Sequence, residues 1–220
     1  MALPKVIYVM GPPGAGKGTQ AEMLAQAIDY HRFSTGDAFR AMTRTDTDLG
    51  RKVKGLIDNG LLCPPELAAE VVISAITKFV DQEKGLVFDG TPRTVREAEI
   101  VDQFFVDHDY GRPLALYLVV GKEDMIERNS KRQFCLDIDG DFPVVTDEDV
   151  KRCEALGGRV GARPDDDPEK FVTRWNEFQE NTAPVIAKYK EEGILEEIDG
   201  KQSVPKVFEE MMAVIEKRRA

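Results

Sequence analysis

The stretch Gly11-Pro-Pro-Gly-Ala-Gly-Lys-Gly-Thr-Gln20 decides how this chain folds. It follows a short apolar run, Val6–Met10, and precedes a segment whose apolar residues recur at helical spacing. In this context a phosphate-binding loop forms, because successive backbone N–H groups and the helix N-terminus face one anion. Lys17 can reach the terminal phosphates of a nucleotide, although Gly18 separates it from Thr19 where a hydroxyl residue usually follows directly. The alternative, a turn that uses its glycines only for geometry, has no use for an unpaired lysine.

Length and charge narrow the class of protein. A chain of 220 residues can form one substantial core with small inserts. Its formal net charge of −10 argues against nucleic acid as a partner, and no apolar run approaches the roughly 20 residues that span a membrane. Three cysteines, an odd number, fit a reducing compartment. We therefore expect a cytoplasmic protein, and a monomer because no apolar surface stripe is visible.

Strand and helix patterns alternate along the chain. Apolar runs predict strands at residues 6–10, 32–34, 86–88, 114–120 and 194–198. Helical patterns lie near residues 19–29, 65–80, 95–107, 122–130, 168–192 and 204–218. This order predicts an α/β fold with a mostly parallel sheet covered on both faces. Residues 34–63 and 131–166 interrupt it, and we expect binding flaps there rather than surface loops, since ligands bind at that edge of such sheets.

Three more motifs lie at the ends of predicted strands or beyond them. Two are the runs Ser34-Thr-Gly-Asp-Ala-Phe-Arg40 and Phe88-Asp-Gly-Thr-Pro-Arg-Thr94. The third is an arginine set that comprises Arg128, Arg132, Arg163 and Arg174, with Asp165 and Asp166 beside Arg163. Together with the loop they resemble the adenylate kinase family of nucleoside monophosphate kinases, nearly end to end. The family's loop has the same Gly-Lys-Gly-Thr ending. The resemblance implies a P-loop three-layer core with a five-stranded parallel sheet (1–33, 64–130 and 167–220), a monophosphate-binding flap (34–63) and a small lid (131–166). It also implies reversible phosphoryl transfer from ATP–Mg²⁺ to a nucleoside monophosphate, AMP first.

The resemblance implies roles for the charged residues. Two polyphosphates repel one another, so cations must line both sides of the transferring group, and the planar fork of arginine suits phosphate oxygens. The implied catalytic residues are Lys17, Arg93, Arg132, Arg163 and Arg174. The implied donor residues are Gly11, Gly14, Ala15, Gly16, Lys17, Gly18, Thr19, Gln202 and Arg128, which would stack on the donor adenine. The implied acceptor residues are Thr35, Arg40, Cys63, Gly90, Arg93 and Glu97. Asp89 would orient Mg²⁺ through water, with Thr19 nearby.

Two of these assignments have alternatives. Arg174 lies on a predicted helix and could instead pair with Glu177 or Glu169. Asp165 and Asp166 are expected to tie a closed lid to the core or the flap rather than to bind metal.

The acceptor-base position departs from the family. Glu97 stands where adenylate kinases usually carry Gln, and Thr91 replaces the usual Phe. An ionised carboxylate only accepts hydrogen bonds, so it suits the amino group of adenine but faces the lone pair of N1. Guanine offers two donors on that edge, which predicts altered or relaxed selectivity. The alternative is that Glu97 points away or binds protonated, and AMP stays preferred.

The lid also departs from the family. Many members hold it with four cysteines on one zinc, but here Cys135 and Cys153 stand alone, with Ile138 and Leu156 at the second positions. We expect no structural zinc and a lid held by apolar packing among Phe134, Ile138, Leu156 and Val160. Asp139-Gly140 fits a two-residue hairpin turn, whereas Thr146 with Asp149 fits the start of a helix. The spacing to Cys153 favours the ribbon.

Two other classes compete with a kinase. A GTP-hydrolysing switch would carry a guanine-reading Asn-Lys-x-Asp motif, which the sequence lacks. A non-catalytic nucleotide-binding protein would not need Lys17, Asp89 and the arginine set together.

Overall fold

The computed structural model describes residues 3–77, 84–138, 141–163 and 168–219 of the chain. Its core is a five-stranded parallel sheet in the order β2-β3-β1-β4-β8. The strands are β1 (Val6–Met10), β2 (His31–Ser34), β3 (Leu86–Asp89), β4 (Leu114–Val119) and β8 (Leu195–Asp199). All five predicted strands are confirmed to within about two residues at either end.

Alternate residues of β1 enter two separate apolar clusters, as the two-residue period of a strand requires. Tyr8 and its neighbours on one face pack against α4 (Pro65–Ile76), α5 (Val95–Asp107) and α9 (Ala183–Glu191). Ile7 and Val9 face α1 (Lys17–Ile28) and α10 (Val204–Arg219) on the other. Burial on both faces explains why β1 reads as a continuous apolar run rather than an alternating one.

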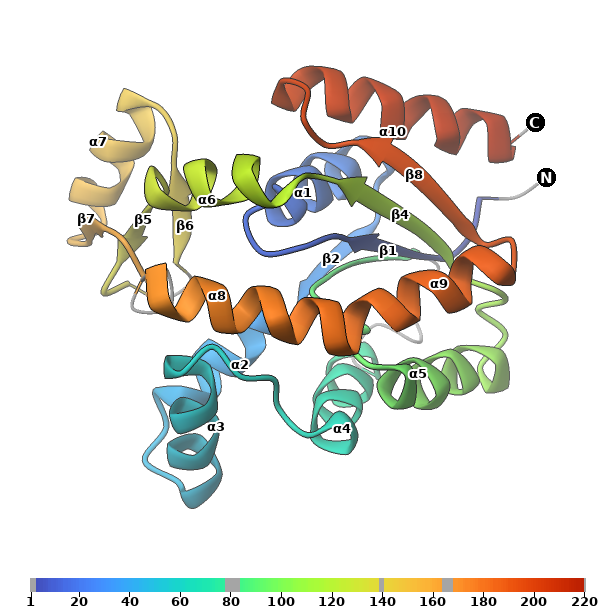
Figure 1. The fold of residues 1–220 in the computed structure, drawn as a ribbon, viewed down its shortest axis with the longest axis horizontal. Helices are drawn as coiled ribbons and strands as arrows, with labels where there is room; N and C mark the ends of the chain where they lie inside the picture. The colour runs from blue at the N-terminus through green and yellow to red at the C-terminus, as the bar shows by residue number, and fades with distance from the viewer. Residues whose placement is uncertain (1–2, 78–83, 139–140, 164–167, 220) are drawn as a thin grey trace.

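The predicted helix at residues 168–192 is one rod with an interruption. It comprises α8 (Pro168–Glu177), a π-helical turn (Phe178–Thr182) and α9, whose first turn contains Pro184. Proline cannot donate to the turn before it, and a local π turn is a common way to accommodate such a break. The rod crosses the front of the sheet in Figure 1.

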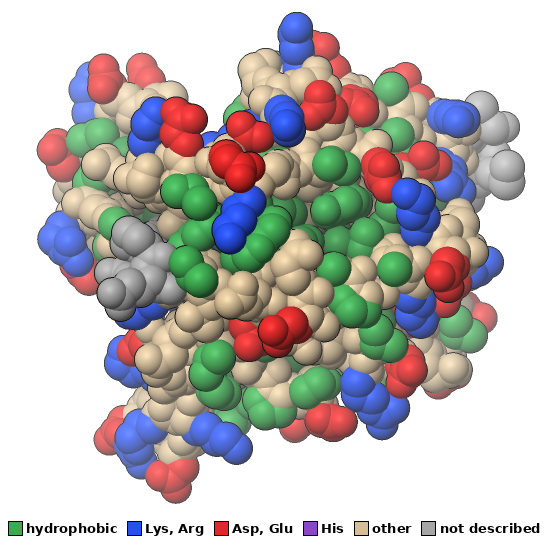
Figure 2. Space-filling view, viewed as in Figure 1, with side chains coloured by type: hydrophobic (Ala, Val, Ile, Leu, Met, Phe, Trp, Pro, Cys, Tyr) green, Lys and Arg blue, Asp and Glu red, His purple; other side chains and the backbone are tan. Residues whose placement is uncertain are grey.

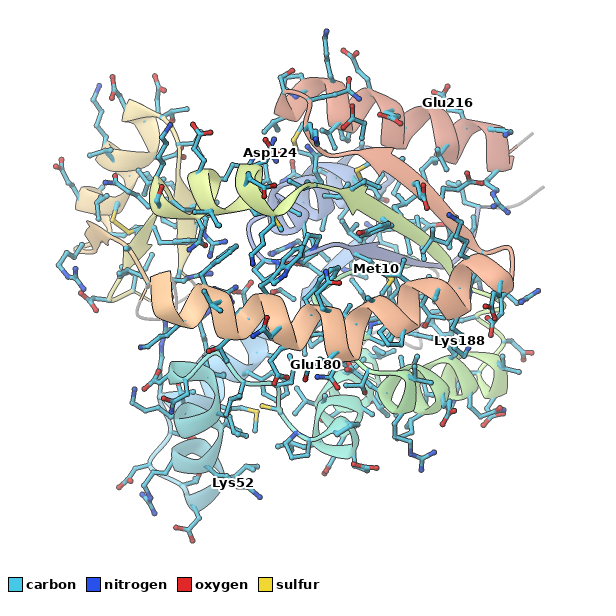
Figure 3. The ribbon with its side chains drawn as sticks, viewed as in Figure 1. Met10, Lys52, Asp124, Glu180, Lys188 and Glu216 are labelled. Atoms are coloured by element: carbon cyan, nitrogen blue, oxygen red, sulfur yellow. A yellow bond between two sulfur atoms is a disulfide. The ribbon has the colours of Figure 1, made fainter. Side chains whose placement is uncertain are left out.

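The first interrupting segment, residues 34–63, contains α2 (Thr35–Thr43) and α3 (Asp48–Asp58). Phe39, Val53 and Cys63 form a small apolar cluster there with Ala68 of α4. In Figure 1 this segment and residues 131–163 both project from the core on the side opposite the two termini. Figure 3 labels Lys52 at the outer end of α3, far from Met10 at the end of β1. Because the charged face of α3 points away from the core, the polarity of this segment is that of a solvated helix.

The second interrupting segment contains a three-stranded antiparallel sheet in the order β6-β5-β7. The helix α6 (Lys122–Ser130) leads into this segment. Its own elements are β5 (Gln133–Leu136), β6 (Phe142–Val144), α7 (Asp147–Ala155) and β7 (Arg159–Gly161). β5 and β6 run antiparallel, but Asp139 and Gly140, the predicted turn, lie outside the described residues. The cysteine spacing favours a ribbon over a helix between Thr146 and Cys153. That prediction is wrong, because α7 occupies these residues. Thr146 and Asp149 form a reciprocal capping box, which satisfies the free N–H groups that open α7.

The packing prediction for this segment is also wrong in part. Phe134 is buried, but Leu156 is 56% exposed and contributes little to a core. Instead a disulfide joins Cys135 of β5 to Cys153 of α7 across 18 residues of sequence. An odd cysteine count does not reveal such a pair, and the inference of a reducing compartment from it loses its basis. Small units without a sufficient core commonly depend on cross-links of this kind.

Among the described helices, none combines the length and the apolar character needed to cross a membrane. On the face shown in Figure 2, hydrophobic side chains gather near the centre, while basic and acidic side chains are interspersed around them. That face therefore presents no continuous basic surface.

Candidate active site

The loop between β1 and α1 takes the form that the glycines require. Gly14 and Gly16 have φ angles of 78° and 89°, in the left-handed region that favours glycine, and Gly16 directly precedes α1. Nothing lies within 4 Å of the place a Gly16 Cβ would occupy, so the mouth of the loop is open. The Lys17 Nζ donates to the carbonyl of Pro12 at 2.9 Å, which folds the side chain back over the loop. Free N–H groups of the first turn and an ammonium thus face one cradle.

Arginines from three segments act on Lys17. Burial lowers its pKa to about 7, opposed by Asp89, and Arg93, Arg174 and Arg132 lower it further. These arginines come from the end of β3, from α8 and from the 131–163 segment. An ammonium that can lose its proton near neutral pH is held among like charges, which is costly unless an anion binds between them.

A pocket of roughly 1100 Å³, counted out to its open mouth, lies beside this cluster. Among the predicted site residues its lining includes Gly11, Lys17, Thr35, Arg40, Cys63, Gly90, Arg93, Glu97 and Arg174. The hydroxyl oxygen of Thr35 is buried and has no hydrogen-bond partner among the described residues. A buried polar atom without a partner is expensive, so a ligand atom is the natural partner for this hydroxyl.

Arg93 and Arg40 both line the pocket. Arg93 Nε donates to the carbonyl of Gly90 at 2.9 Å, and burial together with Arg174 lowers its pKa. Gly90 has a φ of 85° and a Cβ there would lie 2.9 Å from Arg93 Nη2, so glycine makes room for the guanidinium. Arg40, on α2, pairs with Asp37 one turn before it. Both guanidiniums are held by protein carbonyl or carboxylate oxygens, which a phosphate can replace.

Glu97 lines the pocket but is engaged by its neighbours. One carboxylate oxygen accepts from the Thr91 hydroxyl, and the other accepts from the Arg93 backbone N–H at 2.8 Å. Glu97 lies in the first turn of α5, and Thr94 caps this helix by accepting from the Glu97 N–H at 3.1 Å. Burial raises the pKa of Glu97, although these bonds oppose the rise. The two family departures, Thr91 and Glu97, therefore contact each other directly.

Arg132 and Arg163 of the 131–163 segment lie over one aromatic ring. Their guanidinium carbons are 4.6 Å and 3.5 Å from the centroid of Phe134. The charge of Arg163 also reaches Asp37: burial alone would raise the pKa of that carboxyl, but Arg40, Arg32 and Arg163 hold it below its ordinary value. Stacking on the ring helps to fix the direction of both guanidiniums.

Asp141 joins the two projecting segments. It accepts from Arg44, which follows α2, at 2.8 Å, and it lies 3.8 Å from Arg163. Asp165 and Asp166, predicted for such a contact, lie outside the described residues. The signal for Asp141 was present in the acidic run at residues 137–141, where the spacing alone gave no partner.

The residues predicted to bind the donor base, Arg128 and Gln202, do not line this pocket. Arg128, at the end of α6, donates to the carbonyls of Gly200 and Lys201 at 2.8 Å and 3.1 Å. Gln202 follows in the same loop and bonds Glu210. Arg128 is 72 or more residues away in sequence from the residues of the loop after β8. The fold nevertheless brings Arg128 and Gln202 together at this loop.

Asp89 ends β3 next to the phosphate loop. Its Oδ2 lies 3.1 Å from the place a Gly18 Cβ would occupy, so a larger residue at position 18 would crowd the carboxylate against α1. No group of three or more metal-ligating acidic, histidine or cysteine side chains occurs among the described residues. One carboxylate beside a phosphate cradle fits Mg²⁺, which usually keeps several waters and takes its other ligands from the phosphates. Thr19 lies in the first turn of α1.

The parallel sheet, the loop at the carboxyl end of β1 and the converging arginines define a P-loop phosphotransferase. A model of the adenylate kinase family matches residues 9–194. An adenylate kinase of Lachnoclostridium phytofermentans is 37% identical over 96% of this chain and 98% of its own length. Those of Clostridium acetobutylicum and Archaeoglobus fulgidus are 36% and 32% identical over 95% and 96% of the chain, and 98% of theirs. This chain belongs to the adenylate kinase family and is a nucleoside monophosphate kinase.

Proposed function

We propose that this enzyme transfers the γ-phosphoryl group of ATP reversibly to AMP, forming two ADP. The observation that supports this most directly is the set of three arginines around Lys17. They come from three segments of the chain, and two of them, Arg93 and Arg174, line the same pocket as Lys17. Such a set suits two nucleotides whose phosphates repel one another. A protein that only binds one nucleotide has no need for cations on both sides of it.

The proposed division of roles follows the geometry. The loop amides and Lys17 hold the donor phosphates, and Arg40 and Arg93 hold the acceptor phosphate from the flap and the core. Arg132, Arg163 and Arg174 neutralise the charge that spreads over the transferring group. No general base is required, because aligning the two phosphates and stabilising charge account for most of the catalysis. Arg128 and Gln202 would receive the donor adenine.

Mg²⁺ fits beside Asp89 and Thr19 in this proposal. When bound, it neutralises donor oxygens and holds the donor phosphates in one geometry. The chain's own contribution is the carboxylate of Asp89, kept against Gly18 at the start of α1. A zinc-free lid remains a prediction.

AMP is the proposed acceptor because the relatives are named adenylate kinase. Glu97 can still serve the amino group of adenine. Each of its carboxylate oxygens accepts one bond from the protein and has a further lone pair for the amino group of adenine. Thr35, whose hydroxyl has no partner in the described part of the chain, adds a second polar contact on the acceptor side. Guanine, cytosine and uracil acceptors are outcomes of the test below.

The proposed units are a core (1–33, 64–130 and 167–220), a flap (34–63) and a lid (131–166). The contact of Asp141 with Arg44 supports a closed arrangement of lid and flap. Closure would exclude water, which otherwise accepts the phosphoryl group, and opening can limit turnover. The monomeric state and the cytoplasmic location stay predictions.

The test is a coupled assay of diphosphate formation with AMP, GMP, CMP and UMP, for the natural enzyme and Glu97→Gln. We expect AMP to have the highest kcat/KM in both proteins. An inhibitor with two adenosines joined by five phosphates should block the reaction by filling both sites. ATP hydrolysis without acceptor dependence, or nucleotide binding without turnover, would overturn the proposal; a preference for GMP that Glu97→Gln removes would reassign the acceptor.

A further inference from the structure

Arg32 is a charged residue that the proposed mechanism does not use. It lies in β2, the edge strand of the sheet, two residues before the Ser-Thr-Gly-Asp motif. Its Nη2 is 3.4 Å from Asp89 Oδ2 and 3.5 Å from Asp37 Oδ2, and its Nη1 is 3.5 Å from Glu22. One nitrogen is thus shared between the proposed metal carboxylate and a carboxylate of the flap.

The register of the strands explains this meeting. Ser34 of β2 pairs with Asp89 of β3, so Arg32, two residues earlier, lies on the same face one step back. Gly18 faces the pair: a Cβ there would be 3.1 Å from Asp89 Oδ2 and 3.6 Å from Arg32 Nη2. Arg32 and Asp89 therefore occupy the space beside the first turn of α1, where the donor phosphates are proposed to lie.

Four charges then alternate in a row. Arg40 pairs with Asp37 through Oδ1, Asp37 faces Arg32 through Oδ2, and Arg32 faces Asp89. The first member is a proposed acceptor-phosphate residue and the last is the proposed metal carboxylate. Asp89 is only 16% exposed, so its pair with Arg32 is screened less than a surface pair.

We infer that Arg32 is a positioning residue that couples the acceptor-phosphate site to the metal carboxylate. When the acceptor phosphate takes Arg40, Asp37 loses that partner and draws Arg32 toward itself. Asp89 is then less neutralised by Arg32 and accepts more strongly from metal-bound water. The inference rests on the proposed function, and it predicts that acceptor and metal each bind more tightly when the other is present, as linkage requires.

The experiment measures metal binding rather than turnover. Mn²⁺, followed by electron paramagnetic resonance, is titrated into enzyme held with a non-hydrolysable ATP analogue, with and without AMP. In the natural enzyme we expect AMP to tighten Mn²⁺ binding by about fivefold, at the lower end of measured couplings between sites. In Arg32→Gln the ratio should fall to about one, while Arg32→Lys, which keeps the charge, should retain most of it.

A matched control removes the third partner of Arg32. Glu22 is half exposed and, among the described residues, pairs with Arg32 but with neither Asp89 nor Asp37, so Glu22→Gln should leave the ratio unchanged. Cooperative thermal unfolding of each variant establishes that it is folded, and Arg32→Lys serves if Arg32→Gln is not. The inference is wrong if Arg32→Gln keeps the fivefold ratio or if the natural enzyme has none. Loss of AMP-dependent ADP formation in the natural enzyme would instead refute the proposed function.

Discussion

The core sheet and the described part of the proposed lid, residues 131–163, are held together by different interactions. Two apolar clusters on opposite faces of the sheet bury whole side chains of β1, β3 and β4, and the phosphate loop is fixed between them. Residues 131–163 bury few large side chains and depend on a disulfide, a capping box and two arginines over one ring. The core therefore positions groups by packing, whereas the lid positions them by a few specific bonds.

This comparison predicts that single lid residues matter more for chemistry than for the core's stability. Arg163→Ala should lower kcat by about 10²–10³-fold, because one preorganised charge donor is removed from the transferring group. The KM for ATP should change far less, since the loop and Lys17 still hold the donor. Steady-state kinetics with ATP and AMP measure both.

Arg159→Ala is the matched control for Arg163. Arg159 is an exposed lid arginine that pairs with Asp137 at 3.0 Å, away from the pocket. We expect its kcat to stay within twofold of the natural enzyme. Equal losses of kcat and of ATP affinity in Arg163→Ala would contradict the role proposed for Arg163.

The second prediction concerns the disulfide. Closing an 18-residue loop contributes about 3 kcal/mol in the chain-entropy account, so Cys153→Ser should speed hydrogen exchange of lid amides by about a hundredfold. Core amides on β1 and β4 should keep their protection. Treatment of the natural enzyme with a dithiol reductant should reproduce the effect.

Leu156→Ser separates the disulfide from apolar packing. The side chain is largely exposed, so its removal should change lid exchange by less than about twofold. A loss comparable to that of Cys153→Ser would show that the lid depends on apolar packing after all.

The third prediction uses the pKa of Lys17, which is lowered to about 7 in the free enzyme. Only the ammonium form attracts phosphate, so kcat/KM for ATP should fall about tenfold per pH unit above pH 7. Bound phosphates favour the charged form, so kcat should fall only at higher pH. In Lys17→Arg the guanidinium stays charged, and its kcat/KM should be flat from pH 6 to 9. A flat profile in the natural enzyme would refute the assignment.

The smallest expected effect is at the contact between lid and flap. Asp141→Asn should weaken closure by about 0.5 kcal/mol, or roughly twofold, because Arg44 is partly exposed and solvent screens the pair. Fluorescence energy transfer between dyes on residues 52 and 156 reports the closed fraction. Asp137→Asn, which breaks an ion pair inside the lid, should leave that fraction unchanged.

The sequence alone determined the core and its phosphate loop, because their signals are local. Continuous apolar runs, the glycines before Lys17 and the helix patterns each reflect forces between residues close in sequence, and the structure confirms those elements. The motif order identified the family for the same reason. At the lid, capping chemistry at Thr146 decided for a helix where cysteine spacing had favoured a ribbon.

Only the tertiary structure decided which distant groups meet. The pairing of Cys135 with Cys153, the contact of Asp141 with Arg44 and the bond from Thr91 to Glu97 depend on how separate elements fold back on one another. The same holds for Arg32, which reaches Asp89 because two strands 57 residues apart in sequence pair in a fixed register. The sequence gives the sign of each charged side chain but not the group that it contacts. That contact determines how much the charge stabilises the folded protein.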